Sequence, residues 1–338
     1  MKPDPDPSKR PVALLAFGDD YRRQIFGPEE EARLARLVTP VSIDLRVSAA
    51  PLPGAARIML TGWPTPRLIP EILAAMPQLG LVTHAAGSIK PIMPAEGFPA
   101  GLIVTNCVAQ NAIPVAEYAL AAILLANKRI LALGLTYREM RQGRKAVLAN
   151  SQALGNYRRT VGLVGASTIG RLVADMLRPF DLEVIVADPY LSEADAAEMG
   201  VTKVTLAHLF ENADTVSLHA PLLPDTRHMI NASLIDAMKP GATLINTARG
   251  ALVDEEALIA ALQREQIYAI IDTTWPEVPE ANSPLWTLPN LLLTPHIAGA
   301  TSLEIRRFGV AVIDSIEAFL EGRPVPGQVS FDQLDRLA

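Results

Sequence analysis

Three polar residues of different chemistry follow short apolar runs in the last third of the sequence: Arg249, Glu277 and His296. Each apolar run is typical of a buried strand. In an open α/β sheet, ligands bind outside the carboxyl ends of the strands, so these side chains are expected at one crevice. A cation, a carboxylate and an imidazole can hold a carboxylate substrate and move a proton while a dinucleotide transfers hydride.

A glycine-rich turn lies upstream, also at the end of an expected strand. The segment Gly165-Ala166-Ser167-Thr168-Ile169-Gly170 fits the dinucleotide-binding pattern G-x-G-x-x-G, except that Ser167 replaces the middle glycine. Gly165 would allow the tight turn and Gly170 would let the following helix pack on the strand, with pyrophosphate at the helix N-terminus. Whether the Ser167 hydroxyl helps or hinders that contact stays open.

Asp188 ends the next expected strand, about 20 residues after the glycine turn, where an acid would bond the adenosine ribose. Its charge would repel a 2′-phosphate. The pattern therefore predicts NAD rather than NADP as the cofactor.

Composition limits the function classes. The 338 residues suit two domains, and the net charge of -6 argues against a nucleic-acid surface. Cys107 is the only cysteine, so there is no disulfide framework, and no cluster is spaced for a metal; we expect this thiol to serve packing. The start does not read as a signal peptide, and no uninterrupted apolar run is long enough for a bilayer. We expect a cytoplasmic protein that acts on small molecules, away from nucleic acid and membranes.

Apolar runs predict two α/β units. Residues 12–17, 57–61 and 79–84 read as strands of a first, small unit, with helical periodicity over 70–76. Near-continuous apolar runs at 160–165, 184–188, 215–219, 243–246, 269–272 and 291–294 predict a second unit with a parallel sheet. We also expect a long buried helix over 114–133 and a last helix over 302–320, returning to the first domain.

Several segments in this order resemble the D-isomer-specific 2-hydroxyacid dehydrogenases. Beside the glycine turn, they are Val115-Ala116-Glu117-Tyr118, Leu218-His219-Ala220-Pro221-Leu222, Asn246-Thr247-Ala248-Arg249-Gly250, Asp272 with Glu277, and Thr294-Pro295-His296. The resemblance implies an α/β fold with a Rossmann-type doubly wound NAD-binding domain over 109–298. It also implies a smaller, flavodoxin-like substrate domain made of 1–108 and 299–338, NAD in the interdomain cleft, and a homodimer.

The resemblance also implies roles for residues. Arg249 would bind the substrate carboxylate and polarise its carbonyl, His296 would be the acid–base, and Glu277 would orient His296 and stabilise its imidazolium. Ala86, Gly87 and Ser88 match the loop whose backbone holds the other side of the carboxylate. The expected cofactor-binding residues are Gly165, Ser167, Thr168, Ile169, Gly170, Asp188, His219, Ala220, Pro221, Thr226, Thr247, Ala248, Arg249, Asp272 and His296.

Other interpretations of the same residues remain. Arg249 could cap a turn, His296 could be structural and Glu277 could be an exposed loop acid. The leading function is an NAD-dependent D-2-hydroxyacid dehydrogenase. The alternatives are a formate dehydrogenase-like enzyme, which would pair its histidine with glutamine, and an NAD(H)-sensing scaffold, which would keep the same residues.

The sequence does not name the acid or the physiological direction. Gly62-Trp63-Pro64 lacks the arginine expected of a phosphoglycerate-specific member, and Lys90 could either contact an acidic group or be solvated.

Overall fold

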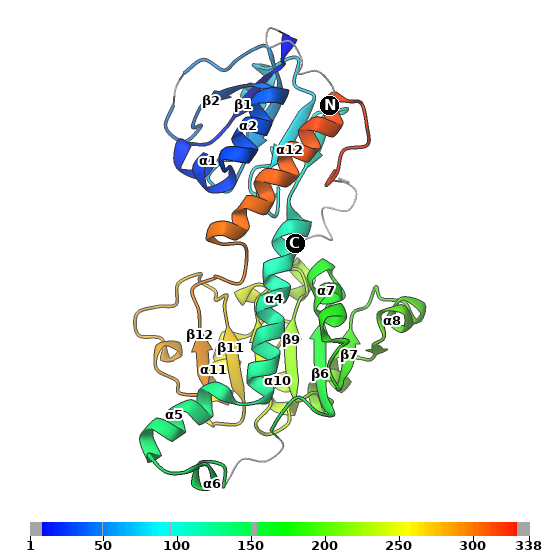
Figure 1. Cartoon of the computed structure of the whole chain (residues 1–338). Helices are drawn as coiled ribbons and strands as arrows, with labels where there is room; N and C mark the ends of the chain where they lie inside the picture. Colours follow the sequence, from blue (N-terminus) through cyan, green and yellow to red (C-terminus); the bar gives the residue numbers. More distant parts are fainter. Residues whose placement is uncertain (1–8, 49, 95, 150–153, 330–338) are drawn as a thin grey trace. The chain divides into compact units, whose positions relative to one another are not determined.

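The chain forms two compact units in the computed structural model, which describes residues 9–48, 50–94, 96–149 and 154–329. The first unit holds the described residues through Asn111 and those from Ala300 onward, and the second runs from Ala112 to Gly299. Each unit is built on a sheet of parallel strands (Figure 1). The predicted α/β class with two parallel sheets is confirmed.

The first unit contains five strands in the order β2-β1-β3-β4-β5, which is the flavodoxin-like order. Their bounds are β1 Val12–Leu15, β2 Thr39–Ser42, β3 Ala56–Thr61, β4 Leu81–His84 and β5 Ile103–Thr105. Successive residues of a strand point to opposite faces, so Leu15 and Leu60 join one apolar cluster while Leu14 and Met59 join the other. Both faces of this sheet are therefore covered.

Helices that are distant in sequence cover one face of this sheet. The helices of the unit are α1 Asp19–Ile25, α2 Pro28–Leu37, α3 Pro70–Ala74 and α12 Arg306–Leu320, the last preceded by the 3₁₀ turn η5 Ser302–Ile305. α12 packs against α1, α2 and β4 through residues such as Phe308 and Val312 (Figure 1). The C-terminal helix thus completes the core that the N-terminal strands begin.

The second unit contains seven strands in the order β12-β11-β10-β9-β6-β7-β8. Their bounds are β6 Arg159–Val164, β7 Leu182–Ala187, β8 Thr202–Lys203, β9 Thr215–Leu218, β10 Thr243–Asn246, β11 Tyr268–Ile271 and β12 Leu291–Leu293. The chain starts in the centre at β6, winds outward to β8, and then crosses back to β9, which is the doubly wound pattern. The crevice where the winding reverses lies at the carboxyl ends of β6 and β9.

Helices lie on both faces of the second sheet. They are α4 Val108–Asn127, α5 Ile130–Met140, α6 Arg144–Val147, α7 Thr168–Leu177, α8 Glu193–Met199, α9 Leu206–Asn212, α10 Ala232–Ala237 and α11 Glu255–Gln263. Residues of α4, α7 and α8 form one apolar cluster with the sheet, and residues of α9, α10 and α11 form the other. α5 and α6 extend away from these layers (Figure 1).

The prediction of a single helix over 114–133 was wrong. α4 begins earlier, at Val108, and ends at Asn127, because the Asn127 carbonyl accepts from the Gly155 N–H (2.9 Å) instead of continuing the helix. Arg129 then adopts a left-handed backbone with φ of 50° before α5 begins. By length and composition α4 could also cross a membrane. In the structure, however, Ala116, Ala119 and Ile123 are buried against the sheet of the second unit.

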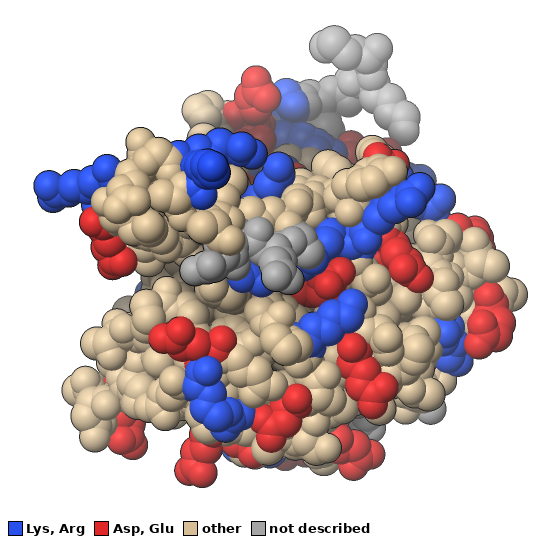
Figure 2. Space-filling model, turned by 90° about the horizontal axis from the view of Figure 1, so that it is seen from below, with Lys and Arg blue, Asp and Glu red and all other residues tan. Residues whose placement is uncertain are grey.

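Charges of both signs are mixed on the face of the molecule in Figure 2. Lys and Arg side chains lie among Asp and Glu side chains there. This distribution accords with the modest net charge of -6.

Candidate active site

The glycine turn joins β6 to α7, as predicted, and two of its positions admit only glycine. Gly165 has φ of +100°, and a Cβ there would lie 2.7 Å from the backbone nitrogen of Ala220. A Cβ on Gly170 would lie 2.1 Å from the Gly165 carbonyl oxygen. The backbone of the turn is therefore in close contact with the segment after β9.

Ser167 occupies the middle position and is the N-cap of α7. Its hydroxyl oxygen accepts from the Gly170 N–H at 3.3 Å, which leaves the hydroxyl proton available for another acceptor. Thr168 and Ile169 form the first turn of α7, whose N–H groups and dipole favour an anion. This geometry suits a phosphate group at the helix N-terminus.

Asp188 follows β7 and is hydrogen-bonded to the same turn. Its two carboxylate oxygens accept from the backbone N–H groups of Ala166 and Tyr190, each at 2.7 Å. Each carboxylate oxygen has a further lone pair, so Asp188 can also accept from a ligand hydroxyl.

Buried polar atoms without partners lie at the ends of the central strands. Both ring nitrogens of His219, which follows β9, and the hydroxyl of Thr247, which follows β10, are buried and have no hydrogen-bond partner among the described residues. Burial lowers the pKa of His219 to about 4, so its ring is neutral at physiological pH. Buried polar groups are normally paired, so these atoms fit a polar ligand such as a dinucleotide.

The segment that follows His219 is held by hydrogen bonds within itself. The Thr226 hydroxyl donates to the Pro221 carbonyl (2.7 Å) and accepts from the Leu223 N–H (2.7 Å). Pro221 and Thr226 thus belong to a rigid turn after β9, ending in the 3₁₀ turn η2 Pro224–Thr226.

Arg249 lies three residues after the end of β10, on a turn held by Asn246. The Asn246 side chain accepts from the Ala248 N–H (3.0 Å) and donates to the Arg249 carbonyl (2.9 Å). One guanidinium nitrogen of Arg249 donates to the Ala248 carbonyl (2.7 Å). The side chain reaches solvent, and its remaining N–H groups can serve an anion.

Glu277 and His296 come together from the ends of β11 and β12. His296 Nδ1 lies 2.5 Å from Glu277 Oε1, and both side chains are accessible to solvent. The charge of Glu277 also acts on Arg249: enclosure by protein atoms lowers the pKa of that guanidinium, and Glu277 opposes the effect. The structure therefore places all three predicted catalytic residues at one edge of the second sheet.

Asp272 supports the turn that carries His296, a role that the sequence did not reveal. Its buried carboxylate accepts from the Thr294 hydroxyl (2.6 Å) and from the N–H groups of Ile297 (2.8 Å) and Ala298 (2.9 Å). The His296 N–H donates to the Asp272 carbonyl (2.9 Å), and His296 itself has φ of 54°. Asn246 and Thr294 likewise position the site. Their only sequence signal is a polar residue at the end of an apolar strand.

The loop after β4 in the first unit presents backbone donors. Its carbonyls are occupied: Ala85 accepts from the Tyr21 hydroxyl, and Ala86 accepts from the Cys107 N–H at 2.9 Å. Within the described part of the chain, the N–H groups of Ala86, Gly87 and Ser88 have no acceptor. Since Ala86 and Gly87 are buried and buried N–H groups are normally paired, this loop fits an anionic ligand.

Cys107, beside this loop, is not a reactive thiol. It is buried in the core of the first unit, and burial raises its pKa to about 12. The neutral thiol serves packing, in line with the sequence-based expectation.

Comparisons with known proteins agree with this architecture. The profile of "D-isomer specific 2-hydroxyacid dehydrogenase, NAD binding domain" matches residues 120–298. The chain is 32% identical to a D-3-phosphoglycerate dehydrogenase of Mycobacterium tuberculosis over 95% of its own length and 57% of that protein. It is also 32% identical to a hydroxypyruvate reductase of Thermotoga maritima, over 73% of this chain and 79% of that one.

A solved structure has the same fold. The D-lactate dehydrogenase of Aquifex aeolicus, in complex with NAD and lactic acid, superposes with a TM-score of 0.66 at 26% identity, covering 92% of this chain and 96% of that one. The predicted nicotinamide dinucleotide cofactor is thereby confirmed at the level of its class.

The chain spans little more than half the length of the phosphoglycerate dehydrogenases that it matches. The match to the NAD-binding domain nevertheless covers more than half of this chain, and the hydroxypyruvate reductase is matched over most of its length. The chain belongs to the D-isomer specific 2-hydroxyacid dehydrogenase family.

Proposed function

We propose that this protein is an NAD-dependent oxidoreductase that interconverts a D-2-hydroxy acid and its 2-keto acid. The observation that carries the proposal is the contact of 2.5 Å between His296 Nδ1 and Glu277 Oε1, near the Arg249 guanidinium. The bound cofactor supplies or accepts the hydride. The remaining chemistry, which is proton transfer and carboxylate binding, belongs to side chains of this chain.

His296 handles the proton in this proposal. Because Nδ1 faces Glu277, Nε2 is the nitrogen left to meet the substrate oxygen. In reduction, the imidazolium gives its Nε2 proton to the carbonyl oxygen. In oxidation, the neutral ring takes the hydroxyl proton from the substrate, and the negative charge of Glu277 stabilises the cation that forms.

The substrate carboxylate is held by charge and by backbone donors. Arg249 offers planar N–H groups that suit a carboxylate better than an ammonium does. In the first unit, we assign the backbone N–H groups of Ala86, Gly87 and Ser88 to carboxylate binding as well, because they have no acceptor among the described residues.

NAD rather than NADP is the cofactor that the site favours. Asp188 is anchored against the glycine turn by two backbone bonds, so its charge is fixed beside the ribose position. A 2′-phosphate there would meet a carboxylate at close range. The other cofactor contacts that we propose are those of Thr168, Ile169, His219, Ala220, Pro221, Thr226, Thr247, Ala248 and Asp272.

We further propose that the protein is a cytoplasmic homodimer joined through α5. None of the eleven residues of this helix is buried within the chain, and Leu131, Leu135 and Tyr137 are exposed. An isolated helix of this length is marginal in water, and exposed apolar stripes usually mark an interface. A second copy of the chain would cover this stripe.

The test is an NADH-oxidation assay over a panel of 2-keto acids, repeated with NADPH. We expect turnover with at least one keto acid, tighter binding of NADH than of NADPH, and loss of most turnover in His296→Ala with NADH binding retained. Full turnover by His296→Ala, or NADPH binding as tight as NADH binding, would contradict the corresponding assignment.

A further inference from the structure

A half-exposed tryptophan follows β3, the neighbour of β4, and the loop after β4 is the one that we assign to the substrate carboxylate. Trp63 follows β3 by two residues, and 49% of its surface is exposed. Its ring meets Tyr21 edge-on at 6.3 Å and Phe308 at 5.4 Å between centroids. Phe308 is fully buried in α12, so the indole rests on a fixed support and presents its other side outward. The first unit thus holds a rigid apolar surface at the carboxyl end of β3.

Tyr21 connects this surface to the carboxylate loop. Its hydroxyl donates to the Ala85 carbonyl, while its ring meets the Trp63 ring edge-on. β3 and β4 are neighbours, with Thr61 paired to His84, so both segments leave the sheet side by side. A small carboxylic acid bound to the N–H groups of Ala86, Gly87 and Ser88 would therefore have Trp63 within reach of its side chain.

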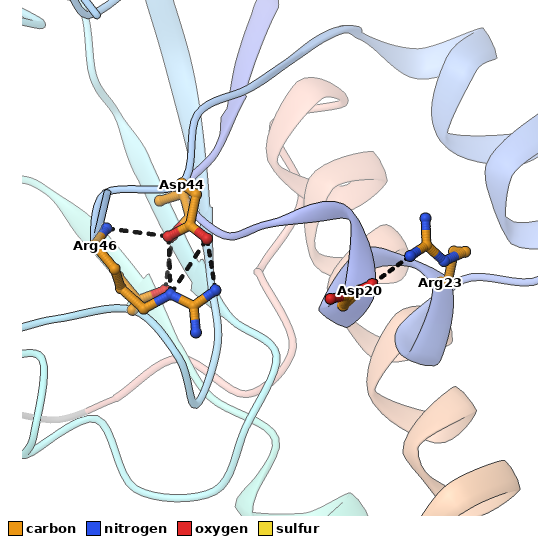
Figure 3. A network of polar contacts seen from close by, with 6 residues as sticks. Asp20, Arg23, Asp44 and Arg46 are labelled. Carbon is orange, nitrogen blue, oxygen red and sulfur yellow. Dashed lines mark hydrogen bonds and ion pairs between the residues drawn. The ribbon is translucent and has the colours of Figure 1, made fainter. Parts of the chain in front are cut away.

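Two cations at this end of the unit are already neutralised. Figure 3 shows Arg46 bound to Asp44, which follows β2, and Arg23 bound to Asp20 in α1. The Arg46 guanidinium lowers the pKa of Asp44, so this pair stays ionised at physiological pH. Because each arginine is already paired with a carboxylate, neither is an unpaired cation for the phosphate of a phosphorylated substrate. Lys90, two residues after Ser88, also takes part in an interaction within the chain. We therefore take apolar contact with Trp63 as the interaction available to a substrate side chain near the loop.

We propose that Trp63 forms the substrate side-chain subsite and that the preferred substrate carries a large apolar side chain, best an aromatic one. This inference rests on the proposed function and deepens it. It sets this chain apart from relatives named for phosphoglycerate and hydroxypyruvate, whose side chains are phosphorylated or hydroxylated.

The test compares three keto acids at saturating NADH with the full chain: phenylpyruvate, pyruvate and 3-phosphohydroxypyruvate. We expect kcat/KM for phenylpyruvate to exceed both other values by about 10-fold or more, since apolar pockets discriminate by factors of this order. In Trp63→Ala, the value for phenylpyruvate should fall by about 10-fold, while that for pyruvate stays within about 3-fold. Trp63→Phe keeps an aromatic surface and should retain most of the preference.

Trp286→Ala provides the matched control. This tryptophan is also about half exposed, but it lies in the second unit, where its indole N–H donates to the Glu280 carbonyl at 2.9 Å. It should leave the preference among keto acids unchanged. NADH binding, followed by fluorescence, should be the same in all variants.

The outcomes separate the two proposals. Turnover that favours pyruvate or 3-phosphohydroxypyruvate, or a preference unchanged in Trp63→Ala, overturns the assignment of Trp63 and leaves the dehydrogenase proposal standing. A folded protein that binds NADH but reduces none of a wide panel of keto acids overturns the proposed function and this inference with it.

Discussion

The buried carboxylate of Asp272 accepts a hydrogen bond of 2.6 Å from the hydroxyl of Thr294. The same carboxylate holds the N–H groups of Ile297 and Ala298, so it fixes the turn on which His296 sits. The position of the imidazole is therefore set by an acid that does not itself contact the ring in this structure. Glu277 contacts the His296 ring, whereas Asp272 holds the turn that carries it.

Asp272→Asn should weaken both stability and turnover. An amide offers one acceptor oxygen where the carboxylate offers two, so at least one donor of the turn loses its partner inside the protein. An unpaired buried donor costs about 1–3 kcal/mol. Urea unfolding should show a loss of this size, with a fall in kcat. Asp236→Asn, at an exposed surface pair, is the control and should change neither. Wild-type stability and turnover in Asp272→Asn would contradict the conclusion that Asp272 supports the turn that carries His296.

Arg249→Lys should damage catalysis although the charge is kept. An ammonium cannot reproduce the planar pair of donors, and we expect a loss on the order of 2–4 kcal/mol in transition-state binding, comparable to removing an oxyanion donor. Steady-state kinetics give this value from kcat/KM. Arg264→Lys, at the exposed pair with Asp236, is the control. Near-normal kcat and KM in Arg249→Lys would reject bidentate carboxylate binding.

Ser167→Gly should be tolerated for cofactor binding. The Ser167 hydroxyl caps α7, and glycine at an N-cap costs only a few tenths of a kcal/mol, whereas alanine costs about 1 kcal/mol. Glycine also lets the backbone approach the pyrophosphate more closely. Titration should therefore give NADH affinity in Ser167→Gly at or above the wild-type level, with Ser167→Ala weaker. A large loss in the glycine variant would instead mean that the hydroxyl donates to the phosphate.

Leu135→Glu in α5 should produce monomers. The charge would have to be buried at the proposed contact between two copies, which is unfavourable without a partner. Light scattering should give a dimer mass for the wild type and a monomer mass for the variant. Glu139→Gln is the control, because it changes the charge of the same helix without placing a charged side chain in the apolar stripe. A wild-type chain that is already monomeric, or a variant that stays dimeric, would rule out this interface.

The sequence predicted the fold, and the place of the candidate catalytic residues within it, for a common reason: buried strands appear as apolar runs, and polar residues that follow these runs lie at the carboxyl ends of the strands. This logic located Arg249, Glu277 and His296. It missed β2 and β8, which lack a distinct apolar run, and it missed β5, which is only three residues long. It also misplaced the end of α4: apolar residues continue beyond Asn127, but the Asn127 carbonyl accepts from the distant Gly155 N–H and the helix ends there.

Side-chain geometry accounts for what the sequence left out. Asp272 was expected at the cofactor, and its hydrogen bonds to Thr294 and Ala298 join residues more than twenty positions away, which spacing alone does not reveal. The exposure of Trp63 likewise depends on α12, which arrives from the far end of the chain.

The pH dependence of keto-acid reduction tests the central claim most directly, because reduction needs the protonated His296. Glu277→Gln keeps the size of the side chain and removes the charge that stabilises the imidazolium. Conditions must be chosen so that chemistry limits the rate. Oxidation uses the neutral ring and should suffer less from the change in protonation.

The decisive comparison is the pH profile of kcat/KM for reduction in the wild type and in Glu277→Gln. We predict that the alkaline limb moves to lower pH in the variant and that the rate at neutral pH falls. An unmoved alkaline limb with wild-type turnover would show that Glu277 does not act through His296, and it would contradict the proposed acid–base pair.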